Sequence, residues 1–246
     1  MQLHSNMKMA DTIHLNYQLL TILERFDISL GFGDKTVKVV CDENNVNVDF
    51  FLEIINSYHD PNYFPKQNLQ TFPVSFIVKY LKKTHSFYLE KKIPLIENFI
   101  EALISGCNTN NKTNLKLVDQ FFQGYKNELI NHIDREETKV QPYVLEIEQA
   151  FKEQVLSESL WKKMNSYSID DFEHEHDNME DKLFDLKNII IKYLPPIQNK
   201  DLCNNILFEL FRLEADLNDH ARIEDKVMVP KIRMMEKELL KRKANS

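Results

Sequence analysis

One spacing of histidine, glutamate and proline occurs twice in this sequence, in two segments that both have a helical pattern. The first copy is HIDREETKVQP, beginning at His132, and the second is HARIEDKVMVP, beginning at His220. In both copies a Glu follows the His by four positions, at Glu136 and Glu224, and a Pro follows it by ten. Residues four apart lie on one face of a helix, where a His and a Glu can hold one metal ion and the Glu can bridge to a second. The repeat therefore predicts two helix faces that can together build a two-metal site.

A single His-x-x-x-Glu would carry little information. Eight histidines at ordinary Glu frequency should give about one such pair by chance, and the alternative reading of each pair is a contact on a helix surface. The shared downstream proline, Pro142 or Pro230, makes the doubled pattern more specific. His220 could also pair with Asp225, five residues on, but Glu224 matches the first copy and is the partner we expect.

The composition favours an all-α fold. The 246 residues include only four glycines, which argues against Gly-rich phosphate loops, a Rossmann fold or a β architecture with many tight turns. Long stretches poor in turn residues and rich in Leu, Ile, Glu and Lys favour helices. We expect a four-helix up-down bundle preceded by a small helical N-terminal domain.

The segment 58–73 carries three prolines and is the best candidate for a domain boundary. We therefore predict a small helical domain over residues 1–60, a linker over 61–73 and the bundle over 74–246. In the small domain, residues 14–26 have a short helical pattern. A further helix is predicted to begin near Asn47, a plausible N-cap, with four apolar residues facing inward: Phe50, Phe51, Ile54 and Ile55.

Four long helical patterns follow the predicted linker, with short connections between them, as in an up-down bundle. They cover residues 74–105, 114–151, 169–194 and 200–242. Ser168 and Asp171 form a Ser-x-x-Asp start for the third. The two repeated prolines fall inside or near the end of helices, which they should kink or terminate. Five aromatic residues are expected in the bundle core: Phe121, Phe122, Phe172, Phe208 and Phe211.

Each of the four long helices carries at least one histidine. His85 falls on the first, His132 on the second, His174 and His176 on the third, and His220 on the fourth. Positions two apart on a helix point to nearly opposite faces, so only one of His174 and His176 can easily face the centre. Metal sites in helical bundles are built from inward-facing side chains in this way. A mixed imidazole and carboxylate set suits iron, ahead of manganese or zinc.

These elements resemble the hemerythrin-like di-iron domain of the iron–sulfur cluster repair proteins. The similarity covers His85 followed by Pro94, the two repeated segments, and Glu175-His176-Asp177. The first 60 residues resemble the small N-terminal domain of the same family, including Gly-x-Gly-Asp-Lys-Thr at 31–36.

The resemblance implies a centre of two iron ions, and it selects His176 over His174. The implied nitrogen ligands are His85, His132, His176 and His220, and the implied bridging carboxylates are Glu136 and Glu224. The implied function is repair of iron–sulfur clusters damaged by nitrosative or oxidative stress. O2, NO or peroxide would be small ligands, and damaged iron–sulfur proteins would be clients. No catalytic side chain beyond the metal ligands is predicted.

Two features depart from the family pattern. An adjacent Cys pair usually precedes the Gly-Lys-Thr turn, but this chain has Leu30-Gly31-Phe32-Gly33 there. A fifth histidine ligand commonly lies between the first two long helices, and the stretch from Ile104 to Leu115 has none. Thiol chemistry is therefore not expected of the N-terminal domain, and one metal position would be completed by water or another residue.

The composition also indicates the cellular environment and limits the classes of partner. Cys41, Cys107 and Cys203 form no C-x-x-C motif, and no segment approaches the roughly 20 apolar residues of a membrane span. We expect a cytoplasmic protein in a reducing environment, without a membrane partner. A net charge of −7 disfavours non-specific nucleic-acid binding.

Two other classes of function stay open at the level of sequence. One is a di-iron sensor of O2 or NO that regulates a partner, and the other is a metal-free helical interaction protein. The N-terminal domain has a helix-turn-helix reading over 34–55, but DENNVNVDFFLE contains no Arg where a recognition helix should be cationic. A protein contact or a homodimer contact is the role we expect for it.

Overall fold

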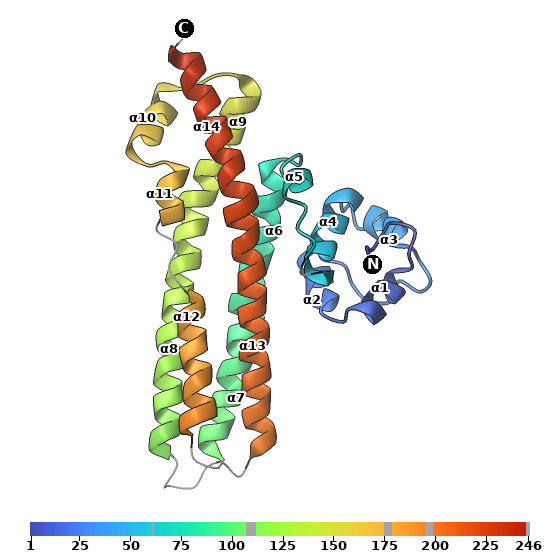
Figure 1. The fold of residues 1–246 in the computed structure, drawn as a ribbon, viewed down its shortest axis with the longest axis vertical. Coiled ribbons are helices and arrows are strands. Elements are labelled where there is room, and N and C mark those ends of the chain that lie inside the picture. The colour runs from blue at the N-terminus through green and yellow to red at the C-terminus, as the bar shows by residue number, and fades with distance from the viewer. Residues whose placement is uncertain (61, 107–111, 175–178, 195–198, 245–246) are drawn as a thin grey trace. The chain divides into compact units, whose positions relative to one another are not determined.

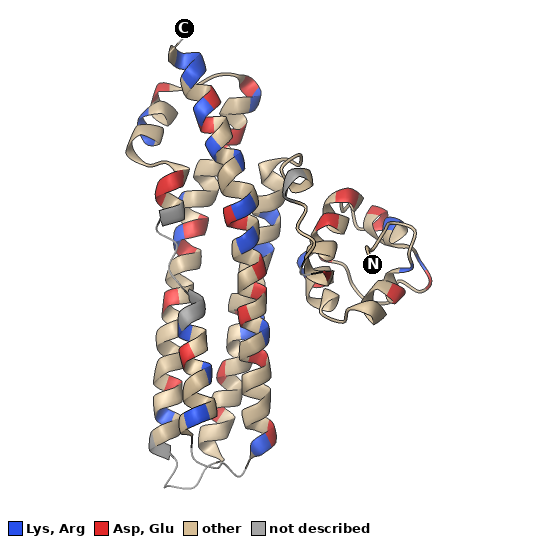
Figure 2. Cartoon of the chain, in the orientation of Figure 1, with Lys and Arg blue, Asp and Glu red and all other residues tan. Residues whose placement is uncertain are grey.

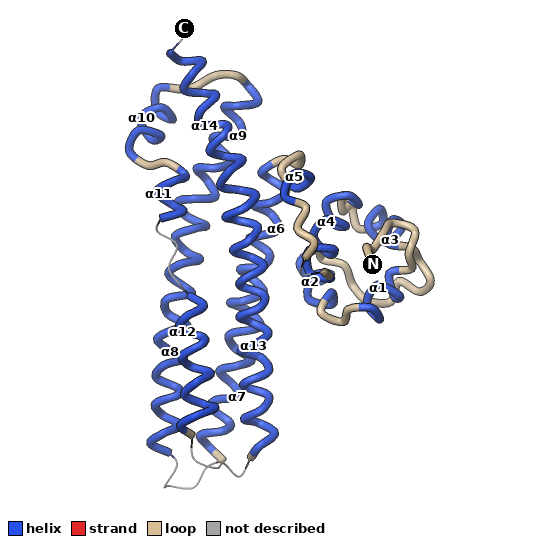
Figure 3. Tube along the Cα trace, in the orientation of Figure 1, coloured by secondary structure: helices blue, strands red, loops and turns tan. Residues whose placement is uncertain are grey.

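The structure is a computed structural model of the whole chain. It describes residues 1–60, 62–106, 112–174, 179–194 and 199–244. The described residues form helices joined by turns, and their only β pairing is an isolated bridge between Lys8 and Thr36. Helices therefore account for all the regular elements in this part of the chain (Figure 3). The expected all-α class is confirmed.

The chain divides into two compact units. The first comprises residues Met1–Thr84, Ile147–Leu156 and Arg222–Ser246, and the second comprises His85–Glu146 and Ser157–Ala221. Both units thus combine segments that lie far apart in the sequence. The predicted division into residues 1–60, 61–73 and 74–246 stays a prediction.

The N-terminal part of the first unit contains four short helices (Figure 1). They are α1 (Met9–Leu15), α2 (Leu19–Arg25), α3 (Val37–Glu43) and α4 (Val48–His59). The predicted N-cap of α4 is confirmed, because the Asn47 side chain accepts a hydrogen bond from the backbone N–H of Phe50 at 2.9 Å. Gly31 and Gly33 have φ values of 100° and 60°, a backbone conformation that glycine adopts without strain. These glycines form the turn that leads into α3.

Helix α4 contributes to the core of this part of the chain together with buried residues of α1, α2 and α3. All four of its predicted inward-facing residues are buried: Phe50, Phe51, Ile54 and Ile55. The Phe51 ring packs edge-on against Phe26, with ring centroids 5.0 Å apart. Arg25 donates from Nη1 to the hydroxyls of Tyr58 and Tyr80, each at 3.1 Å. The buried guanidinium therefore links α2 and α4 to α6 (Val74–Phe87).

The predicted linker is held by side chains from later in the sequence. It contains the short helix α5 (Lys66–Leu69). Lys231 Nζ donates to the carbonyl oxygens of Gln70 and Phe72, both at 2.6 Å. The Glu148 carboxylate accepts from the backbone N–H of Val74 at 2.7 Å and so caps the start of α6. Residues 66–74 are therefore fixed within the first unit by α9 (Gln141–Glu153) and α14 (Val229–Ala244).

The second unit is a helical bundle. Its main helices are α7 (Ile93–Ser105), α8 (Lys112–Arg135), α12 (Met179–Asn188) and the larger part of α13 (Lys200–Ile223). Each helix contributes to one apolar core. Representative members are Ile96 and Ile100, Phe122 and Leu129, Leu183 and Leu186, and Leu210 and Leu213. The hemerythrin-like arrangement of four helices stays a proposal.

Three of the long helical patterns predicted from the sequence, 74–105, 114–151 and 200–242, correspond to helical runs in the structure, and the described residues of the pattern 169–194 are also mostly helical. Ser168 and Asp171 form the expected helix start, because the Asp171 carboxylate accepts from the Ser168 backbone N–H at 2.7 Å. This start belongs to α11 (Ile169–His174). The stretch between the second and third predicted patterns, residues 152–168, was expected to be a short connection, but it contains the helix α10 (Glu158–Ser166). The Ser157 side chain caps α10 by accepting from the Leu160 N–H.

The prediction of an aromatic core was correct for two of the five residues. Phe122 and Phe172 are fully buried, whereas Phe121, Phe208 and Phe211 are 47%, 61% and 47% exposed. Neighbouring residues on a helix point about 100° apart, so Phe121 and Phe122 cannot both face one core.

The repeated prolines do not end their helical runs, and each is the second residue of an α-helix, α9 or α14. Each follows a π-helical turn, in which hydrogen bonds span five residues instead of four. The turns are η3 (Glu136–Val140) before Pro142 and η5 (Glu224–Met228) before Pro230. A third, η1 (Tyr88–Lys92), precedes Pro94 in the same way. The helical runs therefore continue through the prolines as α9, α14 and α7.

Charged residues of both signs are interspersed along the helices (Figure 2). Several form ion pairs between neighbouring helices, such as Lys92 with Glu209 at 2.6 Å. Among the described helices, none combines the length and the apolar character that crossing a membrane requires.

Candidate metal centre

Four of the six predicted ligand residues meet at one point. His85, Glu136, His220 and Glu224 each offer a ligand atom, and these atoms all lie within 4.8 Å of one another. The four residues are buried, with exposed fractions of 1%, 1%, 4% and 2%. A buried group of two imidazoles and two carboxylates could bind a metal ion.

The cluster lies where apolar stripes on the helices become polar. On α13 the buried residues Leu210, Leu213 and Leu217 recur every three or four positions, and the same spacing continues to His220 and to Glu224 at the start of η5. Because this spacing keeps residues on one helix face, the two polar side chains point inward as the leucines do. A polar pair at core positions is thus the sequence signal for this site.

The distances between the nitrogen and oxygen atoms suit a single ion. His85 Nε2 lies 3.2 Å from His220 Nε2 and 3.1 Å from Glu136 Oε2. Two donors on one ion with bonds of about 2.1 Å are about 3.0 to 3.4 Å apart at octahedral or tetrahedral angles. The residues present therefore fit a first-row metal ion held by His85, Glu136, His220 and Glu224.

His132 contacts the other side of Glu136. Its Nε2 atom lies 2.9 Å from Glu136 Oε1, whereas Oε2 of the same carboxylate faces His85. Glu136 therefore presents one oxygen to each of two histidines that come from different helices. This is the arrangement that a carboxylate needs to bridge two metal ions.

The Nδ1 atoms of His85 and His132 lie beside groups of opposite charge. His85 Nδ1 lies 3.1 Å from Glu137 Oε1, so a proton on Nδ1 leaves the Nε2 lone pair directed at the cluster. His132 Nδ1 instead lies 3.4 Å from Arg135 Nη2, which can only donate. That contact favours a proton on Nε2 of His132, directed at Glu136. These contacts therefore favour the metal-binding tautomer, with a free Nε2 lone pair, for His85 but not for His132.

Besides Arg135, two residues of this environment were missed by the sequence analysis. Glu137 directly follows a predicted ligand, and nothing in the spacing separates it from a surface glutamate. Tyr88 is fully buried, and its ring lies edge-on to His220 with centroids 5.9 Å apart. Its position three residues after His85, on the same helix face, could have indicated it.

The remaining predicted ligand, His176, lies outside the described residues, and so does the side chain of His174. The choice between the two histidines therefore stays a prediction. For the fourth helix, the cluster includes Glu224, whereas Asp225 is half-buried and is not one of its members.

Cysteine chemistry has little support in the described part of the chain. Burial raises the pKa of the Cys41 thiol to about 12, with the Asp42 charge adding to the shift, so this thiol stays protonated near neutral pH. Burial also raises the pKa of Cys203. Cys107 lies outside the described residues.

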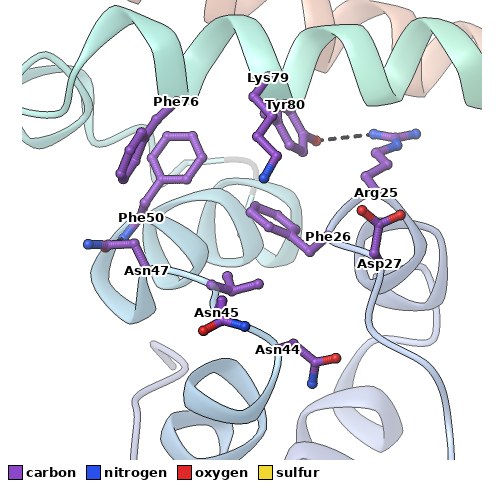
Figure 4. A pocket seen from close by; sticks show the side chains of 11 residues that line it. Arg25, Phe26, Asp27, Asn44, Asn45, Asn47, Phe50, Phe76, Lys79 and Tyr80 are labelled. Carbon is purple, nitrogen blue, oxygen red and sulfur yellow. Dashed lines mark hydrogen bonds between the residues drawn. The ribbon is translucent and has the colours of Figure 1, made fainter.

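A cavity of about 180 Å³ opens in the first unit between α6 and the loop before α4 (Figure 4). Its walls include the rings of Phe26, Phe50 and Tyr80. Lys79 points into the same space, and the hydrogen bond from Arg25 to Tyr80 borders it. The residues that line this cavity include none of the predicted metal ligands.

Neither a scan against protein-family models nor a search of curated proteins found a match to this chain.

Proposed function

We propose that this chain is a non-haem di-iron protein of the hemerythrin-like class. The observation that carries the proposal is the position of Glu136, whose two carboxylate oxygens face His85 and His132 at 3.1 and 2.9 Å. The first metal position would be held by His85, Glu136, His220 and Glu224, and the second by His132, the bridging carboxylates and the predicted ligand His176.

The donor set supports iron. Imidazole nitrogens and carboxylate oxygens suit iron, whereas an all-thiolate or all-oxygen site would suit other metals. Two carboxylate-bridged irons can exchange electrons and bind O2, NO or peroxide at an open coordination position. The chain's own contribution is to bury the centre beside Tyr88 and to orient His85 through Glu137.

The proposed role is the repair of iron–sulfur clusters damaged by nitrosative or oxidative stress. This role is supported by the similarity to the repair proteins, which covers the two repeated segments, His85 and the segment Glu175-His176-Asp177. The buried His and Glu cluster supports the metal centre on which such a role depends. The clients would be damaged iron–sulfur proteins, and the proposed location is the cytoplasm.

Metal content tests the centre directly. We expect the protein produced with iron to contain about two irons per chain and to show an optical spectrum of a carboxylate-bridged pair. His220→Ala should remove most of the iron, whereas His14→Ala, which changes an exposed histidine on α1, should leave the content unchanged. Much less than one iron per chain in the unsubstituted protein would support the metal-free interaction protein instead.

The role needs a separate experiment. We expect the iron-loaded protein to restore activity to an iron–sulfur enzyme whose cluster has been damaged by NO, and the His220→Ala variant to restore none. An iron-loaded protein that restores nothing, but changes its binding to a partner when NO or O2 is added, would instead identify a sensor.

A further inference from the structure

Three π-helical turns begin at residues of the metal centre or in contact with it. In each turn the first residue accepts, at its backbone carbonyl, a hydrogen bond from the N–H five residues later. The acceptors are Glu136 for Gln141, Glu224 for Val229 and Tyr88 for Ile93. The first two acceptors also direct their carboxylates into the cluster, and the ring of the third contacts His220. The same residues therefore define both the π-turns and the walls of the site.

A proline follows each of these turns at the same position. Pro142, Pro230 and Pro94 come directly after the residue whose N–H closes the turn. In a regular α-helix, the Pro142 ring would collide with the carbonyl of Thr138, and the hydrogen bond to that carbonyl would be lost. A π-turn adds one residue to the helical turn, so the run can continue past the proline.

We propose that Pro142 and Pro230 are positioning residues of the metal centre, which exclude regular α-helix after Glu136 and Glu224 and so keep both carboxylates directed inward. This inference rests on the proposed metal-binding function and explains why the proline recurs with the His and Glu. A π-turn that relaxed to α-helix would rotate one flanking helix by about 100° relative to the other. The buried residues on either side could then no longer share one face with the ligand pair.

The proposal is testable because replacing either proline by alanine should weaken metal binding without destabilising the metal-free helix. Alanine is far more favourable than proline in a helix interior, so Pro142→Ala and Pro230→Ala should not destabilise the metal-free protein. They remove the steric block against α-helix after each Glu. The expected result is a midpoint of thermal unfolding that is unchanged or raised without metal, together with weaker metal binding.

The experiment compares the unsubstituted chain with Pro142→Ala, Pro230→Ala and the double variant. Apparent dissociation constants for Fe²⁺ are measured by competition with a chelator under anaerobic conditions. We expect each single variant to bind at least about 10-fold more weakly, the size of effect seen when groups that orient ligands are changed.

Pro73→Ala is the matched control, because Pro73 precedes α6 and adjoins no π-turn. Unchanged iron affinity in Pro142→Ala and Pro230→Ala would overturn the inference while leaving the proposed metal centre intact. Weaker binding accompanied by an equal loss of thermal stability in the metal-free variants would overturn it as well. If the unsubstituted chain binds no iron, the proposed function itself fails. The two failures are therefore distinguishable.

Discussion

His85 and His220 lie 135 residues apart in the sequence and place their Nε2 atoms 3.2 Å apart. Both rings are buried, with centroids 4.9 Å apart and planes inclined at 49°. Two imidazoles that converge on one point beside a carboxylate could bind a metal ion.

The two metal positions should be lost separately. His220→Ala removes a nitrogen from the cluster of four residues, whereas His132→Ala removes only the group on the far side of Glu136. We expect Glu136→Ala, which removes the bridging carboxylate, to lower the iron content most. His132→Ala should retain about one iron per chain. Measurement of iron and protein in the same samples checks this order, and equal losses in all three variants would contradict separate positions.

Glu137 should strengthen metal binding without touching the metal. Its carboxylate lies 3.1 Å from His85 Nδ1 and stabilises a proton there, which makes Nε2 a better ligand. We expect Glu137→Gln to weaken Fe²⁺ binding by about 10- to 100-fold. Glu128→Gln is the control, because Glu128 pairs with Lys182 on the surface. Chelator competition compares the two variants, and equal affinities would remove the orienting role.

Arg135 should weaken the second metal position. Its guanidinium can only donate, and it lies 3.4 Å from His132 Nδ1, so it disfavours the tautomer in which Nε2 is free to bind metal. Arg135→Met keeps most of the aliphatic stem and removes the donor. We expect the second iron to bind more tightly in this variant and the first to bind as before. Titration with Fe²⁺ under anaerobic conditions resolves the two steps.

Metal should stabilise the folded chain. A ligand that binds only the folded state adds about 2.7 kcal/mol to the free energy of unfolding when its free concentration is 100 times its dissociation constant. We expect thermal unfolding to shift upward accordingly on addition of Fe²⁺ and to return on chelation. The His220→Ala variant should show little of this shift. An equal shift in that variant would place the stabilising metal elsewhere.

The second unit should lose stability in acid through Glu209. Burial acts to raise the pKa of this carboxyl, but ion pairs with Lys92 and Arg212 outweigh it and hold the pKa below the ordinary 4.5. A pKa lowered by folding stabilises the protein above the unfolded value. That stabilisation is lost as the pH falls through the lower folded value.

Replacement of Glu209 by Gln tests this pH dependence. We expect Glu209→Gln to reduce the free energy of unfolding at neutral pH by about 1 to 3 kcal/mol, the range for hydrogen bonds to charged groups. The difference from the unsubstituted chain should shrink below pH 4.5 and disappear at lower pH. Urea unfolding at several pH values measures both quantities. A difference that does not vary with pH would assign the effect to packing.

Local patterns identified most of the helices and part of the site. The Asn47 cap, the Ser168–Asp171 start and the inward face of α4 depend on contacts within a few residues, so propensity and spacing were enough. The doubled His-x-x-x-Glu placed each pair on one helix face for the same reason. Helix α10 was missed because the stretch it occupies was treated as a separator between two longer helical patterns.

Contacts between distant segments could not be predicted in this way. The sequence shows that Pro142 interrupts α-helical hydrogen bonding, but the core on both sides determines that the run continues through a π-turn instead of ending. The segment 61–73 has the composition of a linker, yet Lys231 binds two of its carbonyl groups from far along the chain. Exposed Phe208 and Phe211 show the same limit, because the side on which neighbours pack decides burial.

The sequence by itself determined that the chain is helical and that His132 with Glu136, and His220 with Glu224, share helix faces, because both properties follow from local spacing. Only the tertiary structure decided that His85 and His220 meet and that Glu136 turns one oxygen toward each of two histidines. It also decided that Nδ1 of His85 faces the Glu137 carboxylate, whereas Nδ1 of His132 faces the Arg135 guanidinium. These relationships depend on how separate helices pack, and side-chain packing across a core is not encoded in the spacing along any one helix.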